Sequence, residues 1–320
     1  MLFLSIIMPV YNEEKYIRDA LMSVYRQSLG KNKYELIIID DGSTDNTLKI
    51  CRNFSKQYAD INMYMYAQSN MGVSNARNIG LKKARAKYVT FIDGDDILDV
   101  NYLKCAISAF EKNKSIDLIS CPRTQDIKKL GKNKKTYCLI EPCFYMYNYM
   151  LSNTSKYDGY ITNKIFKLSK IRENNIFFRK EITYWEDMLF VEQYLSKCVG
   201  NLMLLNKYYY YYRLNKDSAT FTSDTTRIIK NKYSKAIVAF LISKYANRNS
   251  ELYLCSIRIF NNLLIDYKIL YYKNTITKGQ YLELSKYTNG DLGVALHQAN
   301  LKKKAKYYFA KICHKILHLI

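Results

Sequence analysis

Residues 88–96 have the sequence YVTFIDGDD, in which an apolar run ends directly on an Asp-Gly-Asp-Asp group. A short continuous apolar run is typical of a strand that is buried on both faces of a parallel sheet. We therefore predict a strand over residues 88–92, followed by a polar loop from Asp93 to Asp96. Ligands of open parallel sheets bind beyond the carboxyl ends of the strands, so this loop is a candidate ligand site.

Strand-like and helix-like segments alternate on both sides of this stretch. Apolar runs predict further strands over residues 2–10, 34–39, 61–66 and 117–120. Apolar residues at helical spacing predict helices between the strands. Asn12 and Ser43 are possible N-cap residues of two of these helices. The alternation predicts an α/β fold with a mainly parallel, Rossmann-like sheet flanked by helices over residues 1–220. Long helical stretches after Thr226 predict a basic helical C-terminal region over residues 221–320.

The positive charge of the chain is distributed unevenly. The formal net charge is +22, and the first 110 residues hold 14 basic and 12 acidic side chains, which leaves 36 basic and 16 acidic side chains for the other 210 residues. A basic region behind a nearly neutral α/β portion suits an anionic membrane surface better than nucleic acid. Residues 299–319 have the pattern of a basic amphipathic helix, which could contact such a surface or equally pack on the α/β domain.

The cysteines and the apolar segments bear on the compartment of the protein. Its eight cysteines include no Cys-x-x-Cys pair, a pattern typical of free thiols in a reducing compartment. The first ten residues lack the basic start and the cleavage site of a signal peptide, and no apolar run reaches the roughly 18 residues of a membrane span. We expect a cytoplasmic protein whose membrane contact, if any, is peripheral on the inner face.

Three of the predicted strands end in polar loops, which are Pro9-Val10-Tyr11-Asn12, Asp40-Asp41-Gly42-Ser43-Thr44-Asp45 and Asp93-Gly94-Asp95-Asp96. Each loop taken alone could be a turn that caps a helix. Together they would place four carboxylates in one cleft, where like charges raise one another's pKa and a divalent cation would relieve the repulsion. Mn²⁺ or Mg²⁺ suits such a site, because these ions take one or two carboxylates together with phosphate oxygens.

The sequence contains neither a Gly-x-Gly-x-x-Gly nor a Walker-type phosphate loop, which disfavours a nicotinamide dehydrogenase or a P-loop hydrolase. Phosphates would then be neutralised by a metal and by basic side chains. Arg77, within residues 70–78, is the best-placed candidate, and a surface arginine on a helix is the alternative.

The three loops, together with residues 70–80, resemble the family 2 glycosyltransferases in order and spacing over the first 100 residues. The resemblance implies the GT-A fold, with nucleotide-sugar binding over residues 1–120 and the acceptor side over 121–220. It implies donor-binding roles for Pro9, Val10, Tyr11, Asn12, Glu13, Asp40, Asp41, Asn70, Gly72, Arg77, Asp93, Gly94 and Asp95. Asp41 is the expected contact of the nucleotide base, Asp93 that of the ribose and Asp95 the metal ligand.

The resemblance also implies a general base from a downstream Glu-Asp pair. The chain has one such pair, Glu186-Asp187 after Trp185, and Asp187 is our choice of base. A carboxylate is needed there because an acceptor hydroxyl is a weak nucleophile until its proton is accepted. An acidic start of a helix is the structural alternative. Further contacts with the acceptor or with phosphate are expected from Asp96, Lys164, Trp185, Glu186, Arg213 and Ser218.

The expected activity is inverting transfer of a sugar from a nucleotide diphosphate donor, with uridine as the favoured nucleotide. The acceptor would be a hydroxyl of a glycan, a lipid-linked oligosaccharide or a glycoprotein in the synthesis of a bacterial surface polysaccharide. Two alternatives stay open: a metal-dependent nucleotidyltransferase, which would usually have a glycine-rich loop after its first strand, and a basic nucleic-acid-binding protein. We expect no nucleic-acid partner, and the sequence leaves open whether the chain forms a homo-oligomer.

Overall fold

The computed structural model describes residues 1–133, 138–151, 158–215, 224–273, 275–278, 280, 303–304, 306–308 and 311. Ser218 and most of residues 299–319 lie outside these ranges, so the roles expected of them stay predictions. The chain forms two compact units. Unit 1 comprises Met1–Tyr147, Gly159–Glu181 and Glu186–Phe221, and unit 2 comprises Asn148–Asp158, Ile182–Trp185 and Thr222–Ile320.

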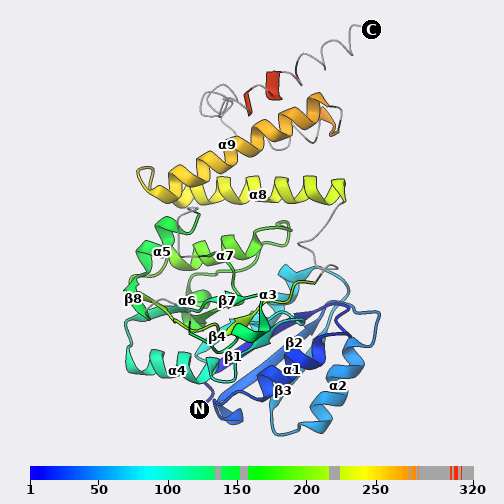
Figure 1. Cartoon of the computed structure of the whole chain (residues 1–320), viewed down its shortest axis with the longest axis vertical. Helices are drawn as coiled ribbons and strands as arrows, with labels where there is room; N and C mark the ends of the chain where they lie inside the picture. The colour runs from blue at the N-terminus through cyan, green and yellow to red at the C-terminus, as the bar shows by residue number, and fades with distance from the viewer. Residues whose placement is uncertain are drawn as a thin grey trace. The chain divides into compact units, whose positions relative to one another are not determined.

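Unit 1 is built around an eight-stranded mixed sheet with the strand order β3-β2-β1-β4-β9-β6-β10-β8 (Figure 1). Its strands in chain order are β1 (Leu4–Val10), β2 (Tyr34–Asp40), β3 (Asn62–Ala67), β4 (Tyr88–Phe91), β6 (Ile116–Ser120), β8 (Leu139–Pro142), β9 (Lys164–Lys167) and β10 (Asn201–Leu204). The pairs β1–β2, β1–β4, β2–β3 and β6–β10 are parallel. β9 is antiparallel to both of its neighbours, β4 and β6.

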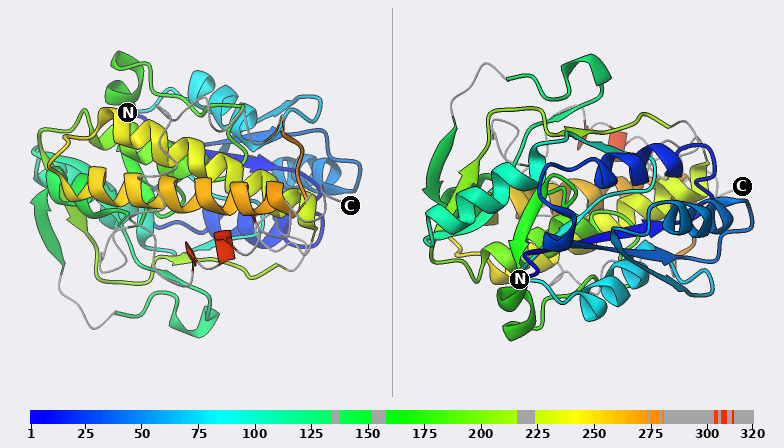
Figure 2. Two further views of the ribbon diagram at one scale, coloured as in Figure 1. Left: turned by 90° about the horizontal axis from the view of Figure 1, so that it is seen from above. Right: turned by 90° about the horizontal axis from the view of Figure 1, so that it is seen from below.

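The first four strands follow the predicted α/β pattern. The intervening helices are α1 (Ile17–Tyr25), α2 (Thr47–Gln57), α3 (Val73–Lys83) and α4 (Tyr102–Lys112). α1 and α2 cover one face of the strands and α3 covers the other (Figures 1 and 2). Every residue of β1 and β2 is buried as a result, which explains their continuous apolar sequences.

Helix α3 lies very close to β1. A Cβ atom on Gly80 would lie 2.3 Å from Cγ2 of Ile7, a distance that real Cβ contacts essentially never show. Only glycine fits at this point of the helix, although glycine costs roughly 1 kcal/mol relative to alanine in a helix interior. The close packing fixes the position of the side chains that α3 carries toward the carboxyl ends of the strands.

A second, three-stranded sheet has the order β5-β11-β7. β5 (Ile97–Leu98) follows the Asp93–Asp96 loop, β7 (Arg123–Thr124) follows β6, and β11 (Tyr210–Tyr211) pairs antiparallel with β5 and parallel with β7. β11 lies within the tyrosine run at 208–212. The pairing brings the residues after β11 next to the aspartate loop.

Five further helical segments of the α/β portion were not predicted from the spacing of apolar residues. They are η1 (Lys31–Lys33), η2 (Ile127–Lys129), α5 (Cys143–Tyr149), α6 (Leu168–Glu173) and α7 (Glu186–Leu195). The predicted caps at Asn12 and Ser43 are wrong, because the residues that precede α1 and α2 are Tyr16 and Asn46. Asn12 and Ser43 instead hydrogen-bond to each other, as described below.

Unit 2 contains the predicted long helices, α8 (Thr225–Tyr245) and α9 (Glu251–Tyr272). Asp224 and Ser250 cap them by accepting from the N–H groups of Thr226 and Tyr253. The helices pack on each other (Figure 1), with the Phe240 and Phe260 ring centroids 5.5 Å apart. None of the described helices has the length and apolar character required to cross a membrane.

Candidate active site

Asn12 ties the loop after β1 to the loop after β2. Its N–H donates to Oγ of Ser43 at 3.0 Å, and its side-chain Oδ1 accepts from the N–H of Thr44 at 2.9 Å. The φ of Asn12 is 55°, in the left-handed region that asparagine tolerates better than most residues. Pro9 and Val10 end β1 at the same edge, and the Tyr11 side chain beside them is exposed.

Asp41 ties the second loop to the segment after β3. Its Oδ1 accepts from the Gln68 side chain at 2.6 Å and from the Met71 N–H at 2.7 Å, and its Oδ2 accepts from the Gly72 N–H at 2.9 Å. Gly72 has a φ of 88° and immediately precedes α3, and Asn70 beside it is exposed. Asp40, at the end of β2, is buried. The structure thus brings the predicted donor segments together, while the contact of Asp41 with a base stays a prediction.

The aspartate loop packs against the first loop at Gly94. A Cβ atom there would lie 3.1 Å from Cγ1 of Val10 and 3.2 Å from Cγ of Glu13, which is tighter than most real contacts. Glycine therefore allows the close approach of the two loops. Three of the predicted donor-binding residues, Val10, Glu13 and Gly94, meet at this point.

Carboxylates cluster around Gly94, and the positive charge of Arg213 offsets their burial and mutual repulsion only in part. Burial, followed by Asp95, Asp93 and Asp45, raises the pKa of Glu13 to about 8. Burial and the neighbouring Asp93 raise the pKa of Asp95 to about 6. The shifts agree with the repulsion expected of clustered acids, and a bound cation would lower both pKa values.

Asp96 faces the protein interior. Its carboxylate accepts from the Tyr210 hydroxyl at 2.5 Å and from the Arg213 N–H at 2.9 Å, and the side chain is fully buried. Arg213 also donates from Nε to the Asp95 carbonyl at 2.8 Å. Asp96 and Arg213 thus connect β11 to the aspartate loop, and the contacts with acceptor or phosphate expected of them are untested.

Arg77, on α3, lies between the aspartate loop and the Glu-Asp pair. Its Nη2 contacts Oδ1 of Asp93 at 3.3 Å, and its Nη1 donates to Oε1 of Glu186 at 2.7 Å. Glu186 and Asp187 begin α7, more than 100 residues after Arg77 in the chain. The fold therefore brings the predicted base close to the predicted donor site.

Asp187 has the properties of a proton acceptor near neutral pH. Burial and the adjacent Glu186 raise its pKa to about 7, against the lowering effects of Arg77, the Met188 N–H and Lys164. Lys164, at the start of β9, is fully buried and donates from Nζ to the Tyr160 carbonyl at 2.7 Å and to Oδ1 of Asn163 at 3.0 Å. Lys164 therefore lies within the protein, where it affects Asp187 through its charge.

Trp185 directly precedes the Glu-Asp pair and has a φ of 68°. The left-handed region is unusual for a bulky residue and is found mainly where the surrounding structure compensates the strain, often at functional sites. The Trp185 ring lies 4.2 Å from Nζ of Lys235, a residue of the same unit. Sequence patterns gave no indication of this backbone conformation.

Sequence reasoning missed three side chains that hold these loops. Gln68 binds Asp41, Tyr210 binds Asp96, and Asn215 hydrogen-bonds to the Asp95 side chain and lowers its pKa. The position of Tyr210 in a tyrosine-rich strand was the one available indication, since a buried tyrosine hydroxyl usually has a hydrogen-bond partner.

The described part of the chain has no group of three or more His, Cys, Asp or Glu side chains arranged to enclose a metal ion. A site formed by Asp95 together with donor phosphates would not require such a group, because Mg²⁺ and Mn²⁺ are commonly held by one or two carboxylates plus phosphate. The raised pKa values of Asp95 and Glu13 fit this arrangement.

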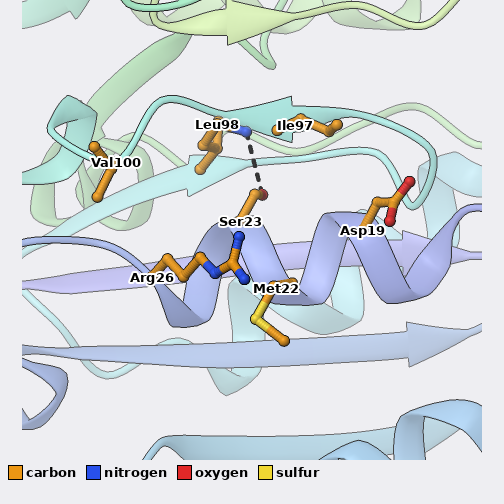
Figure 3. Close-up of a pocket in the computed structure, with 7 residues that line it drawn as sticks. All are labelled: Asp19, Met22, Ser23, Arg26, Ile97, Leu98 and Val100. Atoms are coloured by element: carbon orange, nitrogen blue, oxygen red, sulfur yellow. Dashed lines mark hydrogen bonds between the residues drawn. The ribbon is translucent and has the colours of Figure 1, made fainter.

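A surface cavity of about 360 Å³ lies between α1 and β5 (Figure 3). Asp19 lies at one end and Arg26 at the other, and the N–H of Leu98 donates to Oγ of Ser23 at 3.2 Å beside it. Asp19 also contacts Nη2 of Arg213 at 3.3 Å. None of the cavity's lining residues belongs to the predicted site.

Comparisons with known proteins agree with this geometry. The sequence model described as Glycosyl transferase family 2 matches residues 5–174, more than half of the chain. GgaA of Bacillus subtilis, a minor teichoic acid biosynthesis protein, is 32% identical over 67% of this chain and 48% of its own length. TarS of Staphylococcus aureus, a poly(ribitol-phosphate) beta-N-acetylglucosaminyltransferase, is 28% identical over 70% of this chain and 37% of its own length. The chain thus spans about half or less of these relatives.

Solved structures show the same fold. The crystal structure of TarS residues 1–349 with UDP-GlcNAc covers 98% of this chain and 88% of that one, with a TM-score of 0.64 and 20% identity. The mannosyltransferase PcManGT of Pyrobaculum calidifontis, in complex with GDP-Man and Mn²⁺, covers 99% and 86%, with a TM-score of 0.59 and 14% identity. The predicted GT-A fold with C-terminal helices is therefore confirmed, and the chain belongs to glycosyl transferase family 2.

Proposed function

We propose that the chain is an inverting glycosyltransferase that transfers a sugar from a UDP-sugar to a hydroxyl of a surface glycan. The observation that supports this function most directly is the position of Arg77, which contacts Asp93 of the donor loop at 3.3 Å and Glu186 at 2.7 Å. These contacts support a single site for the proposed donor loop and the Glu186–Asp187 pair, in which burial raises the pKa of Asp187, the proposed base, to about 7. Direct transfer between two bound substrates requires this combination.

The proposed reaction is a single displacement at the anomeric carbon. The Asp187 carboxylate accepts the proton of the acceptor hydroxyl as the new glycosidic bond forms, and the bond to the nucleotide diphosphate breaks. The loops after β1, β2 and β3 hold the nucleotide, with Asp41 at the base and Asp93 at the ribose. One displacement inverts the anomeric configuration, so an α-linked donor would give a β-linked product.

We assign the metal site to Asp95. Many enzymes of this fold use a divalent cation, and the carboxylate oxygens of Asp95 suit Mn²⁺ or Mg²⁺. When bound, the ion would neutralise the charge that develops on the departing diphosphate. Arg213 holds the Asp95 backbone and so keeps this carboxylate in place.

The donor and acceptor proposals come from the relatives' names. TarS is described as a beta-N-acetylglucosaminyltransferase acting on poly(ribitol phosphate), and GgaA as a teichoic acid biosynthesis protein. We propose UDP-GlcNAc and a polyol-phosphate surface polymer as the first donor and acceptor to test. A lipid-linked form of this polymer would lie at the inner membrane face, where the basic C-terminal region could make peripheral contact.

We propose that residues 1–220 form the catalytic domain, with the acceptor side over 121–220, and that residues 221–320 form an accessory basic region. The close contacts among the loops of unit 1 support the first assignment. Helices α8 and α9, which pack on each other in unit 2, support the second.

The function is tested with the full chain, Mn²⁺, UDP-GlcNAc and poly(ribitol phosphate). Asp187→Asn should lower the rate of transfer by about 10³-fold or more. It should change the affinity for UDP by less than about threefold, because the base contributes to proton transfer and not to donor binding. Asp60→Asn, at an exposed carboxylate paired with Lys31, is the matched control and should transfer normally. Retained transfer by Asp187→Asn, or loss of its UDP binding, would show that the base is misassigned.

A further inference from the structure

The contacts of Arg77 are unusual for a phosphate-binding arginine. Its side chain is 7% exposed, and its two terminal nitrogens are committed to Asp93 and Glu186. Within the described chain, the remaining nitrogen, Nε, is buried without a hydrogen-bond partner. A diphosphate would therefore have to reach the second N–H of a terminal nitrogen on a side chain that is almost completely buried.

The surroundings of Arg77 fix its position. The guanidinium lies 5.5 Å from the Phe178 ring centroid. The next residue of α3, Asn78, exchanges two hydrogen bonds with the backbone of Phe178, at 2.7 and 2.9 Å. Because α3 also packs tightly on β1 at Gly80, the arginine is held by the scaffold and not by a mobile loop.

We propose that Arg77 is a positioning residue that joins the donor-side Asp93 to the Glu186–Asp187 pair, so that the donor loop and the proton acceptor form one assembly. The proposal rests on the proposed function and goes beyond it, because it gives Arg77 a role toward the base in place of a role toward phosphate. A guanidinium suits this task, because its two terminal nitrogens contact the two carboxylates from separate positions, whereas lysine has a single nitrogen.

The charges around Asp187 determine in which direction its pKa should change when Arg77 or Glu186 is replaced. Glu186 from the same helix raises its pKa, whereas Arg77 from α3 and Lys164 from β9 lower it. Asp93 faces the other side of the Arg77 guanidinium. Loss of Arg77 should therefore raise the pKa of Asp187, and loss of the Glu186 charge should lower it.

The experiment compares Arg77→Met with Glu186→Gln in the full chain. The Asp187 pKa is read by NMR of ¹³C-labelled aspartate, with the signal assigned by its loss in Asp187→Asn, and the pH profile of transfer is recorded in parallel. We expect the Asp187 pKa to rise by about one unit or more in Arg77→Met and to fall in Glu186→Gln. A rise of the Asp187 pKa from about 7 to about 8 lowers the ionised fraction of Asp187 about fivefold at pH 7. Transfer should fall by at least that factor.

Two further variants separate positioning from general loss of stability. Arg85→Met breaks another arginine–glutamate pair of unit 1, with Glu35 at 2.7 Å, and should leave the Asp187 pKa unchanged. Arg77→Lys keeps the charge and should retain the wild-type pKa of Asp187 while transfer falls, because the single nitrogen of lysine cannot occupy the positions of both Nη1 and Nη2. If Arg77→Met does not fold, wild-type transfer by Arg77→Lys or an unchanged Asp187 pKa in Glu186→Gln would overturn the proposal.

An unchanged Asp187 pKa in Arg77→Met, or shifts of the same sign in Arg77→Met and Glu186→Gln, would overturn the proposal. Weaker UDP binding by Arg77→Met with an unshifted pKa would instead assign Arg77 to the phosphates. The NMR titration requires no turnover, so it remains informative if the wild-type chain transfers no sugar and the proposed function itself fails.

Discussion

Asp187 owes its proposed role to its surroundings more than to its residue type. An ordinary aspartate has a pKa near 4 and accepts a proton poorly at neutral pH. Burial and Glu186 bring the pKa of Asp187 to about 7, close to the value that favours general-base catalysis at neutral pH. Sequence identified the pair, but the pKa depends on Arg77 and Lys164, which only the fold brings near it.

The pH dependence of transfer follows from this pKa. Asp187 must be ionised to accept a proton, so kcat should rise between about pH 6 and pH 8 and level off above, with a midpoint near pH 7. Initial rates at saturating donor and acceptor over pH 5.5 to 9 measure the profile. A flat profile across pH 6 to 8 would mean that Asp187 does not accept the proton in the rate-limiting step.

Asp95→Ala should weaken UDP binding in the presence of Mn²⁺ by about tenfold or more and leave metal-free binding nearly unchanged, because it removes the proposed metal ligand. Calorimetric titration with Mn²⁺ and with EDTA distinguishes the two conditions. Asp99→Ala, just outside the motif, serves as a control that should keep metal-dependent affinity. Equal UDP affinity of Asp95→Ala and wild type with Mn²⁺ present would exclude Asp95 as the ligand.

Residue identity alone did not predict how the loops are held. Asn12 and Ser43 have the composition of helix caps, yet they bind each other across two loops. The same donors and acceptors serve both purposes, and only the packing of β1 beside β2 decides between them. Tyr210 and Asn215 reach the aspartate loop from more than 100 residues away, a distance at which local patterns carry no information.

At the scale of elements, the strands and helices of the first 120 residues and the long helices α8 and α9 were predictable. Four of these strands, β1, β2, β4 and β6, are buried throughout and are mainly apolar runs, whereas the helices have apolar residues at helical spacing. The segment after residue 120 contains short strands and helices of four to seven residues, such as β9 and α6, whose periods cannot be recognised over so few positions. The antiparallel insertion of β9 between β4 and β6 depends on tertiary contacts, which local sequence patterns do not specify.

Helix α7 carries a second buried acid, Glu192, which makes stability depend on pH. Within the described chain both carboxylate oxygens lack a hydrogen-bond partner, and burial raises the pKa to about 8. The folded state therefore holds a proton that the unfolded state releases above about pH 4.5, so the free energy of unfolding should fall as pH rises from about 5 to 8. The loss should be roughly 2 to 4 kcal/mol, at about 1.4 kcal/mol per pKa unit.

Thermal unfolding of wild type and Glu192→Gln at pH 5.5 and 8 tests this expectation. The Tm of the variant should fall less between the two pH values than that of wild type, because glutamine cannot ionise. Glu14→Gln, at an exposed carboxylate, is the control and should follow wild type. Parallel pH dependence in wild type and Glu192→Gln would mean that Glu192 does not remain protonated in the folded state.

At the scale of the whole molecule, the main feature is the uneven distribution of positive charge along the chain. The net charge of +22 lies almost entirely after residue 110, which is C-terminal in the sequence to the acidic donor loops. The sequence was sufficient to predict this separation, since charge counts need no fold. The surface that the C-terminal residues form was not predictable, because a lysine-rich amphipathic helix can pack on protein or on lipid.

The full chain should sediment with vesicles that contain anionic lipid and not with neutral vesicles, because basic clusters are attracted to negative surface potential. Raising the salt concentration from about 50 to 500 mM should reduce the bound fraction severalfold by screening. Replacement of Lys302, Lys303, Lys304 and Lys306 by serine should weaken binding, and the same number of serine replacements among the lysines at 82, 83, 87 and 104 gives the control. Equal binding to both lipid types would contradict the prediction.

The insertion of β9 also affects synthesis on the ribosome. β4 and β6 leave the ribosome well before the strand that separates them in the sheet, since they end at residues 91 and 120 and β9 begins at 164. A nascent chain shorter than this lacks the strand that joins β6 to β4, and unpaired strand edges are prone to wrong pairing. The aspartate loop acquires its last partners only when Arg213 and Asn215 have been made, so we expect the donor site to form after translation of nearly two thirds of the chain.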